Sequence, residues 1–458
     1  MNLTVNEIAK AVGAKNDVSQ WGEQVIVGAE FDSRKLRENT LFVPLKGERD
    51  GHEFIDSAKE KGAVATLWSQ KNELPSDVAV ILVDDVLKAF QDLAVYYLEK
   101  HRPIVVGITG SNGKTTTKDM TAAVLATTFK THKTQGNYNN EIGVPYTILT
   151  MPEHTEVAVL EMGMDHPGDI HTLSMIGKPD IGVVTLIGES HIEYFGTREN
   201  IAVGKMQMVD GVKEKGLVIA PADEPLIVPI LEKVTQEKVL FGDEASADIF
   251  VSVTEEAKNH VRFTLSFLSG EFQLPVPGKY NAKNALLAAY IANRLGVSTK
   301  NIRESLAKVE LTRNRTEWKT AKNGAEILSD VYNANPTAMG LVLDAFVKMP
   351  VQNDGKRIAV LGDMLELGEA AHSMHEAMAV HLSPETIERV FLYGSDMGSL
   401  AKALEKVYPM GSLFYYEKEE KRELIKELKQ TVAPNDLVVL KASNGMGLAE
   451  VVDSLINE

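Results

Sequence analysis

The chain has 458 residues, too many for a single hydrophobic core, and this length predicts about three domains. Hydrophobic residues make up 44% and charged residues 24% of it, a composition typical of a soluble globular protein. Its 48 basic and 64 acidic side chains give a formal net charge of -16, so we expect neither nucleic acid nor an anionic membrane as a partner.

The expected cellular compartment follows from what the chain lacks. It has no cysteine, which excludes disulfides, thiolate metal sites and cysteine nucleophiles and favours the cytoplasm. Residues 1–15 carry charged side chains within a short periodic pattern and do not predict a signal peptide. No later apolar run is long enough to predict a membrane span.

A small mixed α/β domain is predicted for residues 1–83. Thr4 and Glu7 form a capping-box pattern in front of a short helix, and Gly13 is a plausible end for that helix. A longer helix over residues 87–99 opens the next domain. Between them, strand-like or helix-like segments lie at residues 25–29, 40–45, 54–61 and 63–67.

Two polar loops of this first domain are candidates for ligand binding. Residues 31–34 include Ser33 and Arg34, and residues 46–52 include Gly47. Loops rich in serine, arginine and glycine can hold a phosphorylated ligand, with arginine as the bidentate partner. The same residues are common in plain turns, so both interpretations stay open.

Residues 103–118 predict a strand, a glycine-bounded loop and a helix, which is how a phosphate-binding loop is built. Ile108 stands five positions before Gly113, so the spacing is tighter than the usual G-x-x-x-x-G-K-[ST]. In such a loop Lys114 reaches the β- and γ-phosphates and the Thr115 hydroxyl can ligate magnesium. An ordinary strand-turn-helix corner is the alternative. The residues predicted to bind a nucleoside triphosphate, called the phosphate loop below, are Gly110, Ser111, Asn112, Gly113, Lys114, Thr115 and Thr116.

Residues 84–312 predict a central domain with polar side chains at its strand ends. The strand at residues 157–160 leads into Glu161, and the strand at residues 181–187 leads to His191. Ligands of an open α/β sheet lie beyond the carboxyl ends of its strands, so Glu161 is placed where magnesium would bind. His191 is the second candidate ligand, although a lone histidine after a strand is usually a turn residue. An asparagine-rich passage, residues 134–145, supplies amides that could bind a polar ligand.

Lys205 lies in the middle of the apolar stripe of a helix predicted over residues 200–213, so we expect its side chain on the inward face. One interpretation is that its stem packs while the ammonium reaches water. The other is that the amine reacts with CO2 to form a carbamate, an anionic oxygen ligand for a hard cation.

The end of the central domain predicts an antiparallel hairpin on the sheet edge over residues 247–275, with a turn at Ser269-Gly270. A helix then opens at residues 278–285, where asparagines are available for a base or ribose. From residue 313 to 458, strands alternate with helices, which predicts a third, Rossmann-like domain with a parallel sheet. Its strands are expected at residues 327–331, 358–361, 390–393, 413–416 and 437–440.

Together these motifs resemble the Mur ligase family over nearly the whole chain. The phosphate loop is similar to the family's ATP loop, and residues 136–143 are similar to its substrate loop. Residues 332–336 and 361–368 look like the branch that adds D-alanyl-D-alanine to UDP-N-acetylmuramoyl tripeptide. The resemblance implies a three-domain α/β enzyme: a UDP-substrate domain, a central ATP-binding domain with a parallel sheet, and a third domain for the incoming dipeptide. We expect a monomer.

The resemblance also implies roles for individual residues. Glu161, His191 and Lys205 match the family's magnesium ligands, with Thr115 beside them and Lys205 as the carbamate. Tyr280 and residues 441–444 depart from the family pattern. The implied catalytic residues are Lys114, Glu161, His191, Lys205 and Arg315. The implied nucleotide contacts outside the phosphate loop are Asn281, Asn284, Arg315, Asp330 and Asn333, and the substrate contacts are Ser33, Arg34, Gly47, Asn137, Asn139, Asn140 and Asn335.

The implied reaction consumes ATP, uses magnesium, with two ions expected, and passes through an acyl phosphate of the tripeptide, with closure of the third domain as a gate. Another amide ligase of the superfamily is an alternative, either the tripeptide-forming Mur ligase or a folylpolyglutamate synthase. A nucleotide-dependent switch or transport ATPase is an alternative from a different class.

Overall fold

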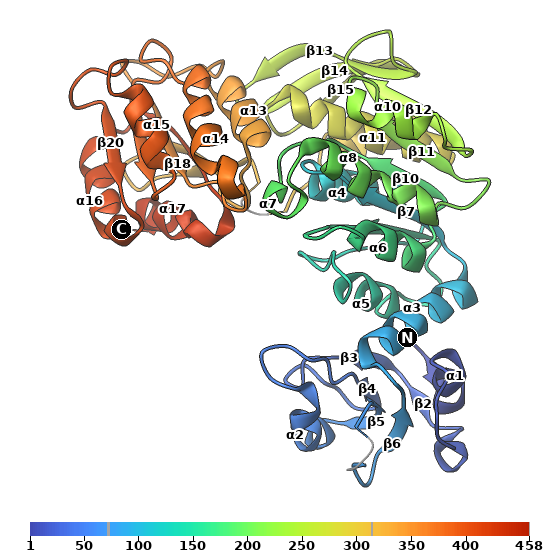
Figure 1. The fold of residues 1–458 in the computed structure, drawn as a ribbon. Coiled ribbons are helices and arrows are strands. Elements are labelled where there is room, and N and C mark those ends of the chain that lie inside the picture. Colours follow the sequence, from blue (N-terminus) through green and yellow to red (C-terminus); the bar gives the residue numbers. More distant parts are fainter. Residues whose placement is uncertain (71–73, 313–314, 458) are drawn as a thin grey trace.

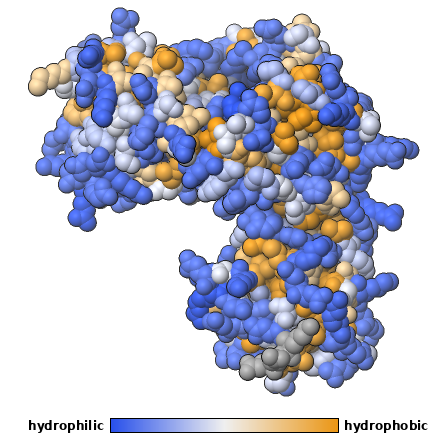
Figure 2. Space-filling view, in the orientation of Figure 1, coloured by the Kyte–Doolittle hydropathy of each residue, from blue (hydrophilic) through white to orange (hydrophobic). Residues whose placement is uncertain are grey.

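The computed structural model describes residues 1–70, 74–312 and 315–457. They form three α/β domains that follow one another around a bend, with the first domain in blue, the central domain in teal to yellow and the third domain in orange to red (Figure 1). In the view of Figure 2, hydrophobic residues gather over the central domain, whereas the outer parts are mainly hydrophilic. None of the helices in the described ranges is both long and apolar enough to cross a membrane.

The first domain has the predicted mixed α/β character. Thr4 Oγ1 accepts a hydrogen bond from Glu7 N at 3.2 Å, and Glu7 Oε2 accepts one from Thr4 N at 2.9 Å, which confirms the capping box. Strands β3 to β6 form a parallel sheet in chain order, and β1 and β2 pair antiparallel beside it. The elements are β1 (Leu3–Thr4), α1 (Val5–Ala11), β2 (Val25–Ile26), β3 (Gly28–Glu30), β4 (Thr40–Phe42), α2 (Ile55–Glu60), β5 (Ala63–Trp68) and β6 (Ala79–Leu82).

A nine-stranded sheet forms the middle of the central domain, in the order β15-β14-β13-β12-β11-β10-β7-β9-β8. Helices α4, α11 and α12 cover one face, and α3, α5, α6, α8 and α9 cover the other. The strands are β7 (Ile104–Thr109), β8 (Thr131–Lys133), β9 (Val157–Glu161), β10 (Ile181–Val184), β11 (Leu217–Pro221), β12 (Glu237–Gly242), β13 (Ile249–Ala257), β14 (His260–Leu265) and β15 (Leu268–Leu274). The helices are α3 (Val86–His101), α4 (Lys114–Leu125), α5 (Gly143–Leu149), α6 (Asp169–Gly177), α7 (Ile192–Phe195), α8 (Arg198–Met206), α9 (Met208–Gly211), α10 (Val228–Leu231), α11 (Lys279–Arg294) and α12 (Thr299–Leu306).

Two details of the central domain differ from the sequence prediction. The edge carries three antiparallel strands, and Ser269-Gly270 lies within β15, opposite a register shift of β14. Gly270 has φ +88°, so its conformational freedom serves a β-bulge rather than the predicted turn. The helix predicted over residues 200–213 is interrupted at Gln207, whose carbonyl accepts a hydrogen bond from Ser174 Oγ of α6 at 3.1 Å.

The third domain contains the predicted parallel sheet, in the order β16-β17-β21-β18-β19-β20. Its edge strand β16 pairs antiparallel with β17 and was not predicted. The predicted domain start at residue 313 lies outside the described residues, and both domain boundaries stay predictions. The elements are β16 (Glu317–Thr320), β17 (Glu326–Asp330), α13 (Pro336–Phe346), β18 (Arg357–Gly362), α14 (Ala371–Ala377), β19 (Arg389–Tyr393), α15 (Met397–Leu404), β20 (Leu413–Tyr416), α16 (Lys421–Thr431), β21 (Leu437–Lys441) and α17 (Leu448–Asn457).

Candidate active site

The phosphate loop joins the end of β7 to the start of α4, as the sequence predicts. Gly110 has φ +145°, and a Cβ there would lie 2.0 Å from Thr185 Oγ1. Gly113 has φ +83°, and a Cβ there would lie 2.6 Å from Asn284 Oδ1. Both positions therefore require glycine, because a side chain would strain the backbone and displace neighbours that fix the loop.

The loop is held by the segment that follows β10. Ser111 N donates to Leu186 O at 2.7 Å, and Ser111 Oγ both donates to Gly188 O and accepts from Gly188 N. Lys114 Nζ donates to the carbonyls of Gly110 and Ser111, at 2.7 and 3.4 Å. In the part of the chain that the structure describes, no carboxylate forms an ion pair with Lys114. Its ammonium is thus held over the loop by backbone carbonyls and is available to an anionic ligand.

A cavity of about 330 Å³ lies over the phosphate loop, between α11 and the third domain. Its lining includes hydrophobic and cationic residues that were not predicted, among them Phe241, Lys279 and Lys283. Tyr280, which departs from the expected family pattern, also lines it, and burial raises the pKa of this phenol. The predicted nucleotide contacts that line the cavity are Ser111, Asn112, Gly113, Lys114, Thr115, Thr116, Asn281, Asn284, Arg315, Asp330 and Asn333, whereas Gly110 lies beneath the loop surface.

The third domain contributes one wall of this cavity. The Arg315 guanidinium stacks over the Tyr332 ring at 4.3 Å, and its Nε forms no hydrogen bond with the residues that the structure describes. Asp330 accepts hydrogen bonds from Lys441 Nζ at 2.5 Å and from Thr316 N at 3.3 Å. Asp330 and Lys441 thus neutralise each other, whereas Arg315 presents its positive charge to the cavity.

Glu161 lies at the end of β9 beside the start of α4 and is 2% exposed. Its Oε1 accepts hydrogen bonds from Thr115 Oγ1 at 3.1 Å and from Asn139 Nδ2 at 2.9 Å. Its Oε2 is buried and accepts no hydrogen bond from the described part of the chain, although Lys118 Nζ lies 3.6 Å away. A buried carboxylate with one free oxygen is a suitable ligand for a hard cation.

The other two predicted metal ligands, His191 and Lys205, lie in the same region as Lys114 and Glu161. Burial and then the positive charge of Lys114 lower the pKa of both His191 and Lys205. Burial also lowers the pKa of Lys114 itself, and the nearby Glu161 carboxylate only partly opposes this shift. These effects of charge require the four side chains to share one region of the structure. The structure therefore brings together the predicted ligands, which are distant from one another in the sequence.

Burial and these neighbouring charges favour neutral side chains at His191 and Lys205. Burial, followed by the charges of Lys114 and Lys205, lowers the pKa of His191 to about 3. His191 Nδ1 lies 2.5 Å from Glu366 Oε2 of the third domain, but not at a hydrogen-bonding angle. Lys205 is 1% exposed, and no group of the described residues bonds to its amine. Burial is the main reason that its pKa falls well below the usual value.

The asparagine-rich passage has both structural and free amides. Asn140 Oδ1 accepts hydrogen bonds from the N–H groups of Ile142 and Gly143 and so caps α5, whereas Asn137 is exposed.

In the first domain, Arg34 pairs with Asp32 through two hydrogen bonds of 2.9 Å and lowers the pKa of that carboxyl to about 2. The first-domain candidates are exposed or half-buried, and they are not among the residues that line the cavity over the phosphate loop: Ser33, Arg34 and Gly47.

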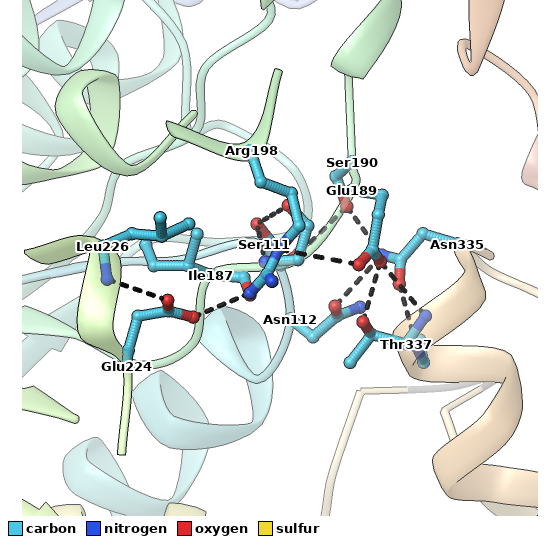
Figure 3. Close-up of polar contacts among 12 residues, drawn as sticks. Ser111, Asn112, Ile187, Glu189, Ser190, Arg198, Glu224, Leu226, Asn335 and Thr337 are labelled. Atoms are coloured by element: carbon cyan, nitrogen blue, oxygen red, sulfur yellow. Dashed lines mark hydrogen bonds and ion pairs between the residues drawn. The ribbon is translucent and has the colours of Figure 1, made fainter. Parts of the chain in front are cut away.

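Asn335, another predicted substrate contact, is 1% exposed and already uses its amide within the protein. Its Nδ2 donates to Asn112 Oδ1 at 3.0 Å and to Ser190 Oγ at 2.7 Å, and its Oδ1 accepts from Ala338 N (Figure 3). Sequence analysis did not identify Ser190 or the neighbouring Glu189, because their partners are distant in the sequence. Lys118 was also missed, although a lysine within a helix that is buried on most sides is a usable signal.

Family models match three successive parts of the chain. The model described as Mur ligase family, catalytic domain matches residues 25–98, and the Mur ligase middle domain matches residues 108–292. The Mur ligase, glutamate ligase domain matches residues 314–444. The chain belongs to the Mur ligase family.

Individual Mur ligases resemble it over their full length. The UDP-N-acetylmuramoyl-tripeptide--D-alanyl-D-alanine ligase of Bacillus subtilis is 40% identical over 455 residues, which are 99% of this chain and 98% of the relative. A crystal structure of MurF from Acinetobacter baumannii has a TM-score of 0.89 at 26% identity, covering 100% of this chain and 99% of that one. MurF ligase from Thermotoga maritima in complex with ADP has a TM-score of 0.82 at 27% identity, covering 93% of this chain and 96% of that one.

Proposed function

We propose that this Mur ligase is an ATP-dependent amide ligase that joins D-alanyl-D-alanine to UDP-N-acetylmuramoyl tripeptide in peptidoglycan precursor synthesis. The observation that carries the proposal is the cavity over the phosphate loop, whose opposite wall is supplied by the third domain. Such a site can hold a nucleoside triphosphate where two other reactants meet. The names of the full-length relatives supply the identities of the reactants, and the Thermotoga maritima complex supports use of an adenine nucleotide.

A carboxylate is a poor electrophile, so the reaction must activate it. The tripeptide carboxylate oxygen attacks the γ-phosphorus, the bond to ADP breaks, and an acyl phosphate forms. The dipeptide amine then attacks the acyl carbon, phosphate leaves, and the amine loses a proton. Lys114 and Arg315 hold the charge that develops on the transferred phosphoryl group, and the phosphate loop fixes its position. Asn281, Asn284, Asp330 and Asn333 surround the rest of the nucleotide.

The residues near Lys114 fit magnesium, the metal that the family resemblance implies. Glu161 offers a free buried oxygen, His191 a neutral imidazole, and Thr115 a hydroxyl. Lys205 is buried and held toward its neutral amine form, which is the form that reacts with CO2 to give a carbamate. These four residues would hold one of the two expected ions. Magnesium would supply neutralisation of the triphosphate charge when bound.

The remaining predicted contacts complete the proposal. Ser33, Arg34 and Gly47 would bind the UDP end of the precursor, and Asn137, Asn139 and Asn140 would bind nearer the reacting carboxylate. Asn139 supports this placement because it already bonds to Glu161. We also propose that the enzyme acts as a monomer in the cytoplasm, where its ATP and nucleotide-linked substrates would be available.

Phosphate release tests the proposed reaction. The purified chain with ATP, magnesium, UDP-N-acetylmuramoyl tripeptide and D-alanyl-D-alanine should release phosphate only when all four are present. Supplying UDP-N-acetylmuramoyl dipeptide with a single amino acid, or a folate with glutamate, tests the two ligase alternatives. Stoichiometric phosphate release without an acid or an amine would contradict the ligase and favour a nucleotide-dependent switch or transport ATPase.

A further inference from the structure

Helix α13 of the third domain begins directly against the phosphate loop. Asn335 is its N-cap, and the side-chain amide of this one residue bonds in two directions (Figure 3). Oδ1 accepts from Ala338 N at 2.8 Å and so caps the helix. Nδ2 donates to Asn112 in the phosphate loop and to Ser190 after β10, at 3.0 and 2.7 Å.

A second contact lies beside the first. Glu189 Oε2 accepts hydrogen bonds from Thr337 N at 3.2 Å and from Thr337 Oγ1 at 2.7 Å. The carboxylate therefore satisfies an N–H group in the first turn of α13, where the helix dipole favours negative charge. On its other side, Arg198 Nε lies 3.7 Å from Glu189 Oε1, and Arg198 also donates to Glu224 at 2.7 Å (Figure 3). The Glu189 carboxylate that contacts α13 is therefore held in position by Arg198, a residue of the central domain.

Helix α13 is also a wall of the nucleotide cavity. Ala338, Leu341, Val342 and Ala345 line the cavity opposite the phosphate loop. If the start of the helix leaves Asn112, this wall leaves with it. The hydrogen bonds of Asn335 therefore connect the loop that binds phosphates to the element that encloses the rest of the nucleotide.

We propose that Asn335 is a positioning residue that latches α13 to Asn112 and Ser190, so that the nucleotide cavity is formed only while the third domain is docked. This set of three residues is called the latch. The proposal rests on the proposed function, because it assumes that ATP occupies the cavity. It assigns Asn335 a role other than the substrate contact predicted from sequence, since its amide hydrogens are already engaged within the protein.

Asn335→Ser separates the latch from helix capping. Serine is as good an N-cap as asparagine, so the start of α13 is preserved, but its hydroxyl is too short to reach Asn112 and Ser190. We expect the KM for ATP to rise roughly 10-fold, from the loss of two buried hydrogen bonds. Ser190→Ala should raise the KM for ATP by a smaller factor. The KM of the double variant should not exceed that of Asn335→Ser, because the two residues share one contact.

Domain position is a readout that separates the latch from a direct substrate contact. The chain has no cysteine, so cysteines introduced at exposed Lys233 and Lys402 would be its only thiols and can carry spin labels. With a non-hydrolysable ATP analogue bound, the wild-type background should show a single, narrow population of inter-domain distances. Asn335→Ser should add a longer-distance population.

Thr337 provides a second pair of variants if Asn335→Ser folds poorly. Thr337→Val removes the hydroxyl that donates to Glu189 and should shift KM and distances in the same direction, whereas Thr337→Ser should restore both. Wild-type KM and distances in Asn335→Ser would overturn the latch, as would a raised KM for the dipeptide alone with unchanged distances. If the wild-type chain does not ligate, the proposed function fails, while the distances with bound analogue still support or overturn the latch.

Discussion

Lys118 Nζ lies 3.6 Å from Glu161 Oε2, and the two side chains are 1% and 3% exposed. Lys118 also lies 3.4 Å from Asp119 Oδ1, but Asp119 has further partners in Lys133 and Thr312. Glu161 therefore depends on Lys118 as its nearest positive partner in a region almost without water. Removing the close positive partner of a buried carboxylate is destabilising, because the carboxylate charge is then poorly solvated and no longer paired.

Lys118→Met should accordingly lower the free energy of unfolding of the central domain by about 3–5 kcal/mol. The measurement is denaturant unfolding followed by far-UV circular dichroism. The matched control is Lys300→Met in α12, whose ion pair with Glu304 is 79% and 58% exposed and should contribute less than about 0.5 kcal/mol. Equal unfolding midpoints for the two variants would show that the buried pair does not stabilise the domain.

Lys114→Ala should abolish turnover and leave the fold intact. The ammonium bonds only to two backbone carbonyls in the described structure, so folding does not depend on its charge. Loss of a group that stabilises transferred charge lowers kcat by on the order of 100-fold or more. Steady-state phosphate release measures the loss, thermal unfolding checks the fold, and exposed Lys402→Ala serves as the control. Near-normal ligation by Lys114→Ala would refute the assignment of the phosphate loop.

Lys205→Ala should lose activity and partly regain it with added short carboxylates such as formate or acetate. Truncation leaves a space beside His191 in which a small carboxylate can replace the oxygens of the carbamate. Lys205→Arg keeps a positive charge but fills that space, so it should be inactive and not rescued. Carbon-13 NMR of the wild-type enzyme with labelled bicarbonate should show a carbamate signal that Lys205→Ala lacks. An active enzyme without this signal would exclude the carbamate.

Much of the site was predictable because its signals are local. The phosphate loop is specified by a strand, two glycines and the start of a helix within residues 103–118, and the structure confirms all three parts. The inward position of Lys205 followed from helix periodicity and is likewise confirmed by its burial. Local signals also misled: Ser269-Gly270 is typical of a turn, but strand pairing with β14 converts it into a bulge.

The sequence by itself determined the family, the order of the elements and the residues of the phosphate loop, because spacing along the chain carries that information. Only the tertiary structure decided that Asn335 meets Asn112, 223 residues away, and that Asp330 is neutralised by Lys441. Such pairings depend on how one domain docks on another. Docking is set by shape and by buried hydrogen bonds between distant segments, and neither leaves a periodic trace in the sequence.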